Sequence, residues 1–427
     1  MSFNQNWSED EQNYYRITQF NPRSATKLGG ISIPYADITN LDIGRNRNLG
    51  GLDLDGCKFT SLDLSSNPKL RILYCSKNQL TNLNVSNNTA LEYLHCTSNH
   101  ITVLDVSKHT KLISLYCNYN QIKNLDTSNS PALEILSCGG NQLTHLGVSN
   151  NTKLTYLNCD GNQITDLDVR NNVALTGLSC QSNQLSNLDV SNNLALTFLS
   201  CNNNQLNNLN VNNNTNLERL ECAGNQLTNL DVSNNTKLTY LYCIVNNIPL
   251  ANLYDLAKQT ANIETKYLGQ QNLSDSTVLL HTPIAIDTVF YGVNTDVSCL
   301  GGRTDFTFVN GEITFLSTGS YIVQISNPAI ANSDGSLAHV QQIFNVIDGT
   351  GIHVIPQAKT MEIWIQNDHL YVDSPVDETI QVYSVHGVLL YRFEKPAGKA
   401  SYLITQSKGV VLIVKGSSGW VKKVIKN

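Results

Sequence analysis

The chain has 427 residues, more than one ordinary globular domain, so its length predicts several domains or a repeat array. Its net charge of −6 argues against the basic surface that binding to nucleic acid or to an anionic membrane requires. No apolar run approaches the roughly 18 residues that span a bilayer, and the opening MSFNQNWSEDEQ lacks the charged and apolar segments of a signal peptide.

Residues 1–27 are predicted to form an N-terminal helical cap. Trp7 is suitably placed as a hydrophobic staple, Ser8 is a good N-cap, and Glu11 completes a capping box. Such a cap would cover the first turn of the repeat array that follows.

Residues 28–250 contain a repeat of 21 residues, which is marked by nine regularly spaced cysteines: Cys75, Cys96, Cys117, Cys138, Cys159, Cys180, Cys201, Cys222 and Cys243. The unit L-x-x-L-x-C-x-x-N-x-(L/I)-x-x-L-D-V-S-N-N-x-x begins like the leucine-rich-repeat consensus, with cysteine replacing the third leucine. Units opening with LGGIS and LGGLD extend the array back to Leu28, giving about eleven coils. We predict an α/β horseshoe-shaped solenoid with a parallel sheet on its concave face and turns or 3₁₀ segments on the return path.

The column of nine cysteines is interpreted as packing. Strand alternation points Leu157 and Cys159 to the same inner face, and the equivalent position of the first two coils holds Ile33 and Leu54. Buried cysteine behaves as a small hydrophobe. Disulfides, a metal site and catalysis are the alternatives, but parallel Cβ vectors, ligands that do not converge and the lack of a companion histidine argue against them. We therefore expect no metal and no cofactor.

Two polar columns accompany the cysteines. The first, at each strand exit, is predicted to be buried and to bond main-chain groups of its own and the adjacent coil: Asn78, Asn99, Asn120, Asn141, Asn162, Asn183, Asn204, Asn225 and Asn246. The second consists of Asp42, Asp63, Asp105, Asp126, Asp168, Asp189 and Asp231. Asx turns are our interpretation of the aspartates, and calcium binding is the alternative, although no DxDxDG loop is present.

The repeat LTNLDVSNNTKLTYLYCIVNN resembles the repeats of the internalin family, in which a 21-residue coil with a cysteine in its strand forms a cysteine ladder. The resemblance covers about half of the chain. It implies a leucine-rich-repeat fold and a protein that is secreted or displayed on a bacterial surface, where it binds a host or surface ligand.

Three segments follow the repeats. Residues 251–272 are predicted to hold a C-terminal cap helix and a linker, with Leu250, Leu253, Leu256 and Ala257 on one helical face. Residues 273–348 alternate with period two around turns at Asn310-Gly311 and Thr318-Gly319, which indicates a β-meander and a small β-sandwich. This segment resembles the immunoglobulin-like modules that follow leucine-rich repeats in bacterial surface proteins.

Residues 349–427 alternate again and are predicted to form a second all-β sandwich. Three segments carry a resemblance to the C-terminal sorting domain of type IX secretion: residues 380–387, 409–414 and 422–426. This resemblance implies an export role, although the usual G-x-Y of the central strand is replaced by Gly409-Val410-Val411.

The outward positions of the strands decide what the solenoid can bind. Aromatic residues gather there on the first cysteine-bearing coils and on the last one, with a more polar middle. Exposed aromatic side chains on a rigid sheet suit protein contacts and also stack on sugars, whereas the structural alternative is that they simply suit exposed sheet. The candidate ligand-binding residues are Tyr74, Tyr93, His95, Tyr116, Tyr156, Phe198, Tyr240 and Tyr242.

The hypothesis favoured by the sequence is a non-enzymatic recognition or adhesion protein that binds a protein or carbohydrate ligand, such as one of a host, and acts as a monomer. A structural spacer without a ligand is the alternative. An enzyme is the third hypothesis, but no Ser/His/Asp, paired-carboxylate or metal constellation stands out. His95 and Cys299 are interpreted as ordinary surface and core residues rather than catalytic ones.

Overall fold

A computed structural model describes Pro22, residues 27–286, 289–290 and 293–348, and the seven strands that lie between residues 362 and 425. The predicted N-terminal cap helix and the Gly409-Val410 pair lie outside the described residues. No described helix has the length and apolar character needed to cross a membrane.

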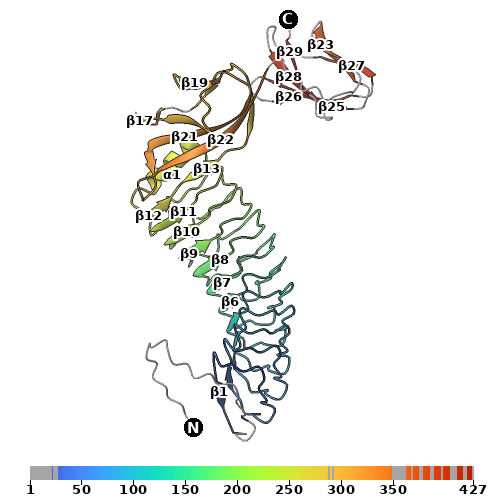
Figure 1. The fold of residues 1–427 in the computed structure, drawn as a ribbon, viewed down its shortest axis with the longest axis vertical. Coiled ribbons are helices and arrows are strands. Elements are labelled where there is room, and N and C mark those ends of the chain that lie inside the picture. Colours follow the sequence, from blue (N-terminus) through green and yellow to red (C-terminus); the bar gives the residue numbers. More distant parts are fainter. Residues whose placement is uncertain are drawn as a thin grey trace. The chain divides into compact units, whose positions relative to one another are not determined.

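The solenoid carries a 12-stranded parallel sheet in which each strand pairs with the next along the chain (Figure 1). Every strand has three residues, and equivalent residues of neighbouring coils are in register, such as Leu157 with Leu178. The strands are β1 (Gly30–Ser32), β2 (Gly51–Asp53), β3 (Ile72–Tyr74), β4 (Tyr93–His95), β5 (Ser114–Tyr116), β6 (Ile135–Ser137), β7 (Tyr156–Asn158), β8 (Gly177–Ser179), β9 (Phe198–Ser200), β10 (Arg219–Glu221), β11 (Tyr240–Tyr242) and β12 (Thr265–Tyr267).

The return paths of the coils consist of turns, and no helix is found in the described coils. Backbone bonds from residue i to i+3 tighten these paths, as from Val148 O to Asn151 N (2.9 Å) and from Asn151 O to Leu154 N (3.0 Å). The α/β designation is therefore wrong for the coils themselves, because a 21-residue coil leaves too little chain for a helix. The leucine-rich-repeat solenoid is as predicted.

The cysteine column lies inside the solenoid. All nine thiols of the ladder are fully buried, and none forms a disulfide. Burial raises the pKa of Cys96, Cys138, Cys201 and Cys243 to about 12, so these groups are thiols and not thiolates at neutral pH.

The strand-exit asparagines join consecutive coils. Asn162 Nδ2 donates to the carbonyl of Cys159 in its own coil (3.0 Å) and to that of Cys138 in the preceding coil (3.2 Å), while its Oδ1 accepts from Leu143 N (3.0 Å). The same pattern recurs at Asn183 and the following members of the column. This confirms the predicted role of the column.

A second asparagine column is also buried, which the sequence analysis did not anticipate. In each SNN turn the second asparagine donates to two carbonyls of the preceding coil; Asn193 Nδ2, for example, bonds Val169 O and Asn172 O, both at 2.9 Å. His109 and Ser130 replace asparagine in two coils and still bond backward, to Val85 O and His109 O.

The aspartate column forms Asx turns, as predicted. Asp63, Asp105, Asp126, Asp168, Asp189 and Asp231 each accept a bond from the main-chain N–H two residues later, at 2.9–3.0 Å. Asn84 and Asn210 make the same bond where they replace aspartate.

The last coil is closed by α1 (Leu250–Gln259), which buries Leu250, Leu253, Tyr254, Leu256 and Ala257. The chain then adds β12 in parallel to β11, where the sequence predicted only a linker. The sequence TKY lacks the inward leucine of the repeat, so only backbone pairing identifies this strand.

Gln271 ends the asparagine ladder. Its buried side chain donates from Nε2 to Cys243 O (3.0 Å), and its Oε1 accepts from Ile248 N (3.4 Å). These are the bonds that a further ladder asparagine would make to the eleventh coil.

The segment after the solenoid forms small sheets. One has the order β13-β22-β21-β18, with β14 also paired to β22, and others are β15-β20-β19 and β16-β17. The strands are β13 (Gln270–Asn272), β14 (Ser276–Leu279), β15 (Ile284–Ala285), β16 (Val289–Phe290), β17 (Val293–Asn294), β18 (Asp296–Leu300), β19 (Phe306–Val309), β20 (Glu312–Phe315), β21 (Gly319–Ala331) and β22 (Leu337–Ile347).

The hairpin turn at Asn310-Gly311 is confirmed, and both residues have positive φ. The prediction of a β-meander through this segment is wrong, because β20 and β21 belong to different sheets. Arg303 fixes the bend between them: its guanidinium donates to Ser317 Oγ (2.7 Å) and to Thr318 O (3.2 Å). The immunoglobulin-like assignment remains a prediction.

Two further sheets follow, with the orders β23-β24-β27 and β26-β25-β28-β29, all antiparallel. Their strands are β23 (Glu362–Gln366), β24 (His369–Ser374), β25 (Glu378–Ser384), β26 (Leu389–Lys395), β27 (Gly398–Leu403), β28 (Val411–Gly416) and β29 (Val421–Ile425). The sorting-domain resemblance remains a prediction.

Replacing Asn162 by leucine should lower the free energy of unfolding by about 2–4 kcal/mol, because buried main-chain groups of two coils lose their partner. Urea unfolding followed by circular dichroism measures the change. The control is Asn171→Ala, which removes an exposed amide that makes one long bond (3.4 Å). Equal shifts in the two variants would contradict the structural role of the ladder.

A thiol reagent should react promptly with only one of the 11 cysteines in the native protein, the half-buried Cys299, because the other ten are buried. All 11 should react after denaturation. Cys299→Ala should abolish the prompt phase, and rapid labelling of ladder cysteines in that variant would show that they are accessible.

Candidate functional site

The strand face of the solenoid carries all eight predicted ligand-binding side chains, and each is half-buried. They do not form one continuous patch. Strand β6, which carries Ile135 and Ser137 in the same columns, separates a first group on β3–β5 from the others. The others form a second group on β7–β9 and, next to it, a third on β10–β12.

The first group is an aromatic ladder. Tyr74, His95 and Tyr116 are register partners on adjacent strands. The rings of Tyr74 and His95 stack with centroids 4.4 Å apart at 18°, and His95 meets Tyr116 edge-on at 4.5 Å. Burial lowers the pKa of His95, so its ring is neutral at neutral pH. Burial and, to a smaller extent, the neighbouring Tyr93 raise the pKa of Tyr74.

The second group surrounds a glycine. A Cβ atom at Gly177 would lie 2.8 Å from the ring of Tyr156 and 3.9 Å from the ring of Phe198. The two rings on β7 and β9 therefore cover the bare backbone of β8, and glycine is needed there for close approach.

The third group includes two residues that the sequence analysis did not select. The guanidinium of Arg219 lies 3.8 Å from the centroid of the Tyr240 ring and donates from Nε to Glu221 Oε1 (2.6 Å). Tyr242 meets Tyr267 of β12 edge-on at 5.8 Å. Tyr267 could not be recognised from the sequence, because β12 does not match the repeat.

The polar middle of the face is hydrogen-bonded within itself. The Asp160 carboxylate accepts four bonds, from Asn158, Ser179 and both the main chain and the side chain of Gln181, at 2.7–3.1 Å. Three coils further along, on β10, Glu221 accepts from Ser200 and Asn202 at 3.1 and 3.0 Å. These groups have little remaining bonding capacity, so the aromatic groups are better candidates for ligand contact.

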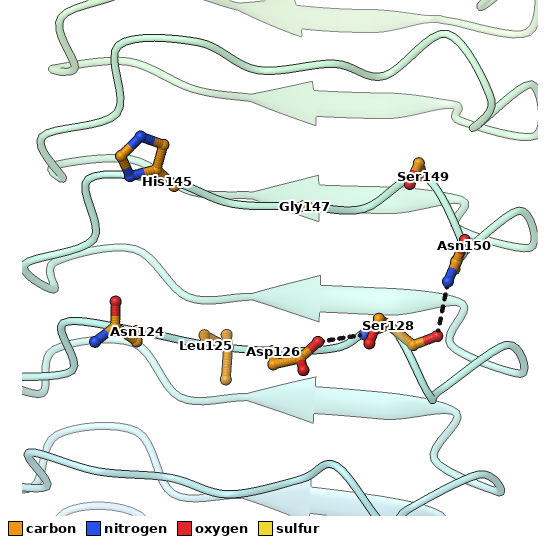
Figure 2. A pocket seen from close by; sticks show the side chains of 8 residues that line it. All are labelled: Asn124, Leu125, Asp126, Ser128, His145, Gly147, Ser149 and Asn150. Atoms are coloured by element: carbon orange, nitrogen blue, oxygen red, sulfur yellow. Dashed lines mark hydrogen bonds between the residues drawn. The ribbon is translucent and has the colours of Figure 1, made fainter.

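A pocket of about 320 Å³ lies away from the strand face, on two neighbouring return paths (Figure 2). Gly147 stands there in place of the column aspartate, and a Cβ atom added to it would have no neighbour within 4 Å. Asp126 and Asn150 in its lining bond Ser128. The pocket is thus the space that an aspartate side chain would occupy at position 147. No group of three or more His, Cys, Asp or Glu residues that could hold a metal ion occurs in the described part of the chain.

No protein-family model and no curated protein matches the sequence. Among solved structures, the functional domain of InlJ from Listeria monocytogenes, which includes a cysteine ladder, is 28% identical, with 78% of this chain and 84% of that chain covered and a TM-score of 0.55. A leucine-rich-repeat protein from Leptospira interrogans is 24% identical (57% and 70% covered, TM-score 0.50), and the internalin InlF from Listeria monocytogenes is also 24% identical (58% and 80%, TM-score 0.49). The likeness to InlJ and the Leptospira protein supports a leucine-rich-repeat solenoid, and that to InlJ extends to its cysteine ladder.

Proposed function

We propose that the protein is a non-enzymatic recognition protein that binds a protein ligand on the strand face of its solenoid. The observation that carries this proposal is the ladder of Tyr74, His95 and Tyr116, which presents aromatic side chains at the surface of a sheet whose strands are fixed by hydrogen bonds on both sides. Aromatic residues held in this way lose little conformational entropy on binding and are typical of binding hot spots.

A protein ligand is favoured over a glycan by the orientation of the rings. Tyr74 and His95 lie on neighbouring strands and stack face to face, so their planes stand upright on the sheet and their edges point outward. A sugar ring packs against an open aromatic face, and the stacked pair leaves such a face only on the side of Tyr74 turned toward β2, whereas a protein surface uses ring edges and tyrosine hydroxyls equally well. At the other end of the solenoid, Arg219 already occupies one face of Tyr240.

The proposal includes a location at the bacterial cell surface or outside the cell, as the internalin resemblance implies. Burial of the ladder thiols is compatible with an oxidising compartment, because thiols without solvent access are poor substrates for oxidation. Protease treatment of intact cells tests the location: a surface protein is degraded without lysis.

Tyr74→Ala combined with Tyr116→Ala should weaken ligand binding by at least about 2 kcal/mol and leave the melting temperature nearly unchanged, because both side chains are half-buried on the outer face. The ligand would be identified by screening the full chain against arrays of extracellular proteins and of glycans, and affinity measured by biolayer interferometry.

Tyr119→Ala is the matched control, since Tyr119 is 69% exposed and follows the strand at a turn. Unchanged affinity in the double variant would place the site elsewhere. The spacer alternative predicts that neither array yields a ligand, and the glycan alternative predicts hits on the glycan array alone.

A further inference from the structure

One of the two outward columns of the strand face carries no side chains on the first two strands. The outward positions ahead of the buried Ile31 and Leu52 are Gly30 and Gly51. A Cβ atom at Gly51 would have no neighbour within 4 Å, and one at Gly30 would find only Gly51 O at 3.7 Å. On β3 the glycine column continues with Ile72, and the neighbouring outward column, which holds Ser32 and Asp53 on β1 and β2, continues with Tyr74. A step therefore rises from β2 to β3.

Tyr74 forms the side of this step that faces Asp53, and Ile72 the side that faces Gly51. Its ring is stacked on one face by His95 of β4. The opposite face is turned toward β2, where its register partner is Asp53 and not an aromatic residue. The aromatic ladder therefore ends in an open ring face next to a carboxylate.

Two carboxylates lie at this end, Asp53 and Asp55. Neutral donors hold both in place: Ser32 Oγ donates to Asp53 Oδ2 (2.9 Å), and Ser76 N donates to Asp55 Oδ1 (2.5 Å). Neither carboxylate makes an ion pair with any residue that the structure describes. Burial is the main cause that raises the pKa of Asp55, and the charge of Asp53 adds to it, while the hydrogen bond from Ser76 and the charge of Lys77 act in the opposite direction.

The same chain fills two comparable arrangements with its own arginines. Arg219 stacks on Tyr240 at 3.8 Å and bonds Glu221. Arg303 stacks on Tyr321, also at 3.8 Å, and donates to both oxygens of Asp305. In each case a flat guanidinium lies on a tyrosine ring and pairs with a nearby carboxylate, which a compact ammonium group does less well. Tyr74 with Asp53 and Asp55 has the ring and the carboxylates but no arginine.

We propose that the step formed by Gly30, Gly51, Asp53, Asp55 and Tyr74, here called the arginine shelf, receives an arginine side chain of the protein ligand. The guanidinium would stack on the open face of Tyr74 and donate to the two carboxylates, and the glycines leave room for its aliphatic part. This inference rests on the proposed function and adds to it the chemistry of the ligand: a basic segment reaching the first coils. The negative charge of the shelf matches such a segment.

The probe is a fluorescein-labelled tri-arginine peptide, titrated with the full chain at low salt and followed by fluorescence anisotropy. The tri-citrulline peptide has nearly the same shape without the charge, and tri-lysine has the charge without the planar group. We expect saturable binding of tri-arginine, binding of tri-lysine weaker by roughly tenfold, and none of tri-citrulline. Equal binding of arginine and citrulline peptides would overturn the proposal.

Two variants locate the binding. Asp53→Asn with Asp55→Asn should weaken tri-arginine binding by at least about tenfold. Gly51→Leu keeps the charge but fills the shelf, and its open surroundings accommodate the side chain, so it should weaken binding as strongly. The control is Asp166→Asn with Asp255→Asn, the same change of charge at exposed positions outside the strand face. If the control loses as much as the shelf variant, or if Gly51→Leu binds normally, the shelf is not the site.

The shelf and the proposed function fail in different ways. If the tri-arginine peptide does not bind but Tyr74→Ala with Tyr116→Ala abolishes capture of the macromolecular ligand, the strand face is a recognition surface and the shelf inference is wrong. If the peptide binds at the shelf while that double variant leaves ligand capture intact, the ligand is recognised elsewhere and the shelf is not the site of its arginine, although it binds arginine peptides.

Discussion

The hydrogen bonds of the buried asparagines, which tie each coil to the one before it, are the constraint on which the structure depends. A strand of three residues followed by a sharp exit leaves main-chain groups of both coils inside the solenoid, where an unpaired group costs about 1–3 kcal/mol. Asn162 and its equivalents satisfy these groups across the coil boundary. The bonds have the correct length only when successive coils have the same number of residues, so they maintain the 21-residue period.

Register along the solenoid follows from this period. Since Leu157 lies opposite Leu178, every position of the repeat stacks on its own counterpart in the next coil. Inward, this alignment produces a column of leucines and one of small thiols. Outward, it places Asp53, Tyr74, His95 and Tyr116 in one line. The arrangement of the surface is therefore a consequence of the interior bonding, although the outward residues contribute little to it.

The sequence predicted the features that recur in every coil, but it did not predict the residues that end the array. Periodicity alone placed Cys159 inside, Asn162 at the strand exit and the Asx turns of the aspartates. The second asparagine column could not be recognised because SNN looks like an ordinary polar turn, and only the fold brings Asn193 within reach of two carbonyls of the preceding coil. Gln271 makes the ladder's bonds from a different strand, with a longer side chain and outside the 21-residue spacing, so no pattern could reveal it.

The candidate binding site, too, could be predicted from the sequence only in part. The aromatic positions followed from strand alternation, because each lies beside an inward leucine. Their grouping did not, since it depends on ring orientation and on partners such as Arg219 and Tyr267 that break the pattern of the repeat. In the middle of the face Asp160 is saturated by neutral donors, and on β10 Glu221 is paired with Arg219. We therefore expect binding at β2–β5, where an aromatic ladder ends beside two carboxylates that form no ion pair with the described residues. A ligand that satisfies this end of the sheet gains interactions that the chain cannot provide for itself, which is the physical basis for expecting recognition at the first coils.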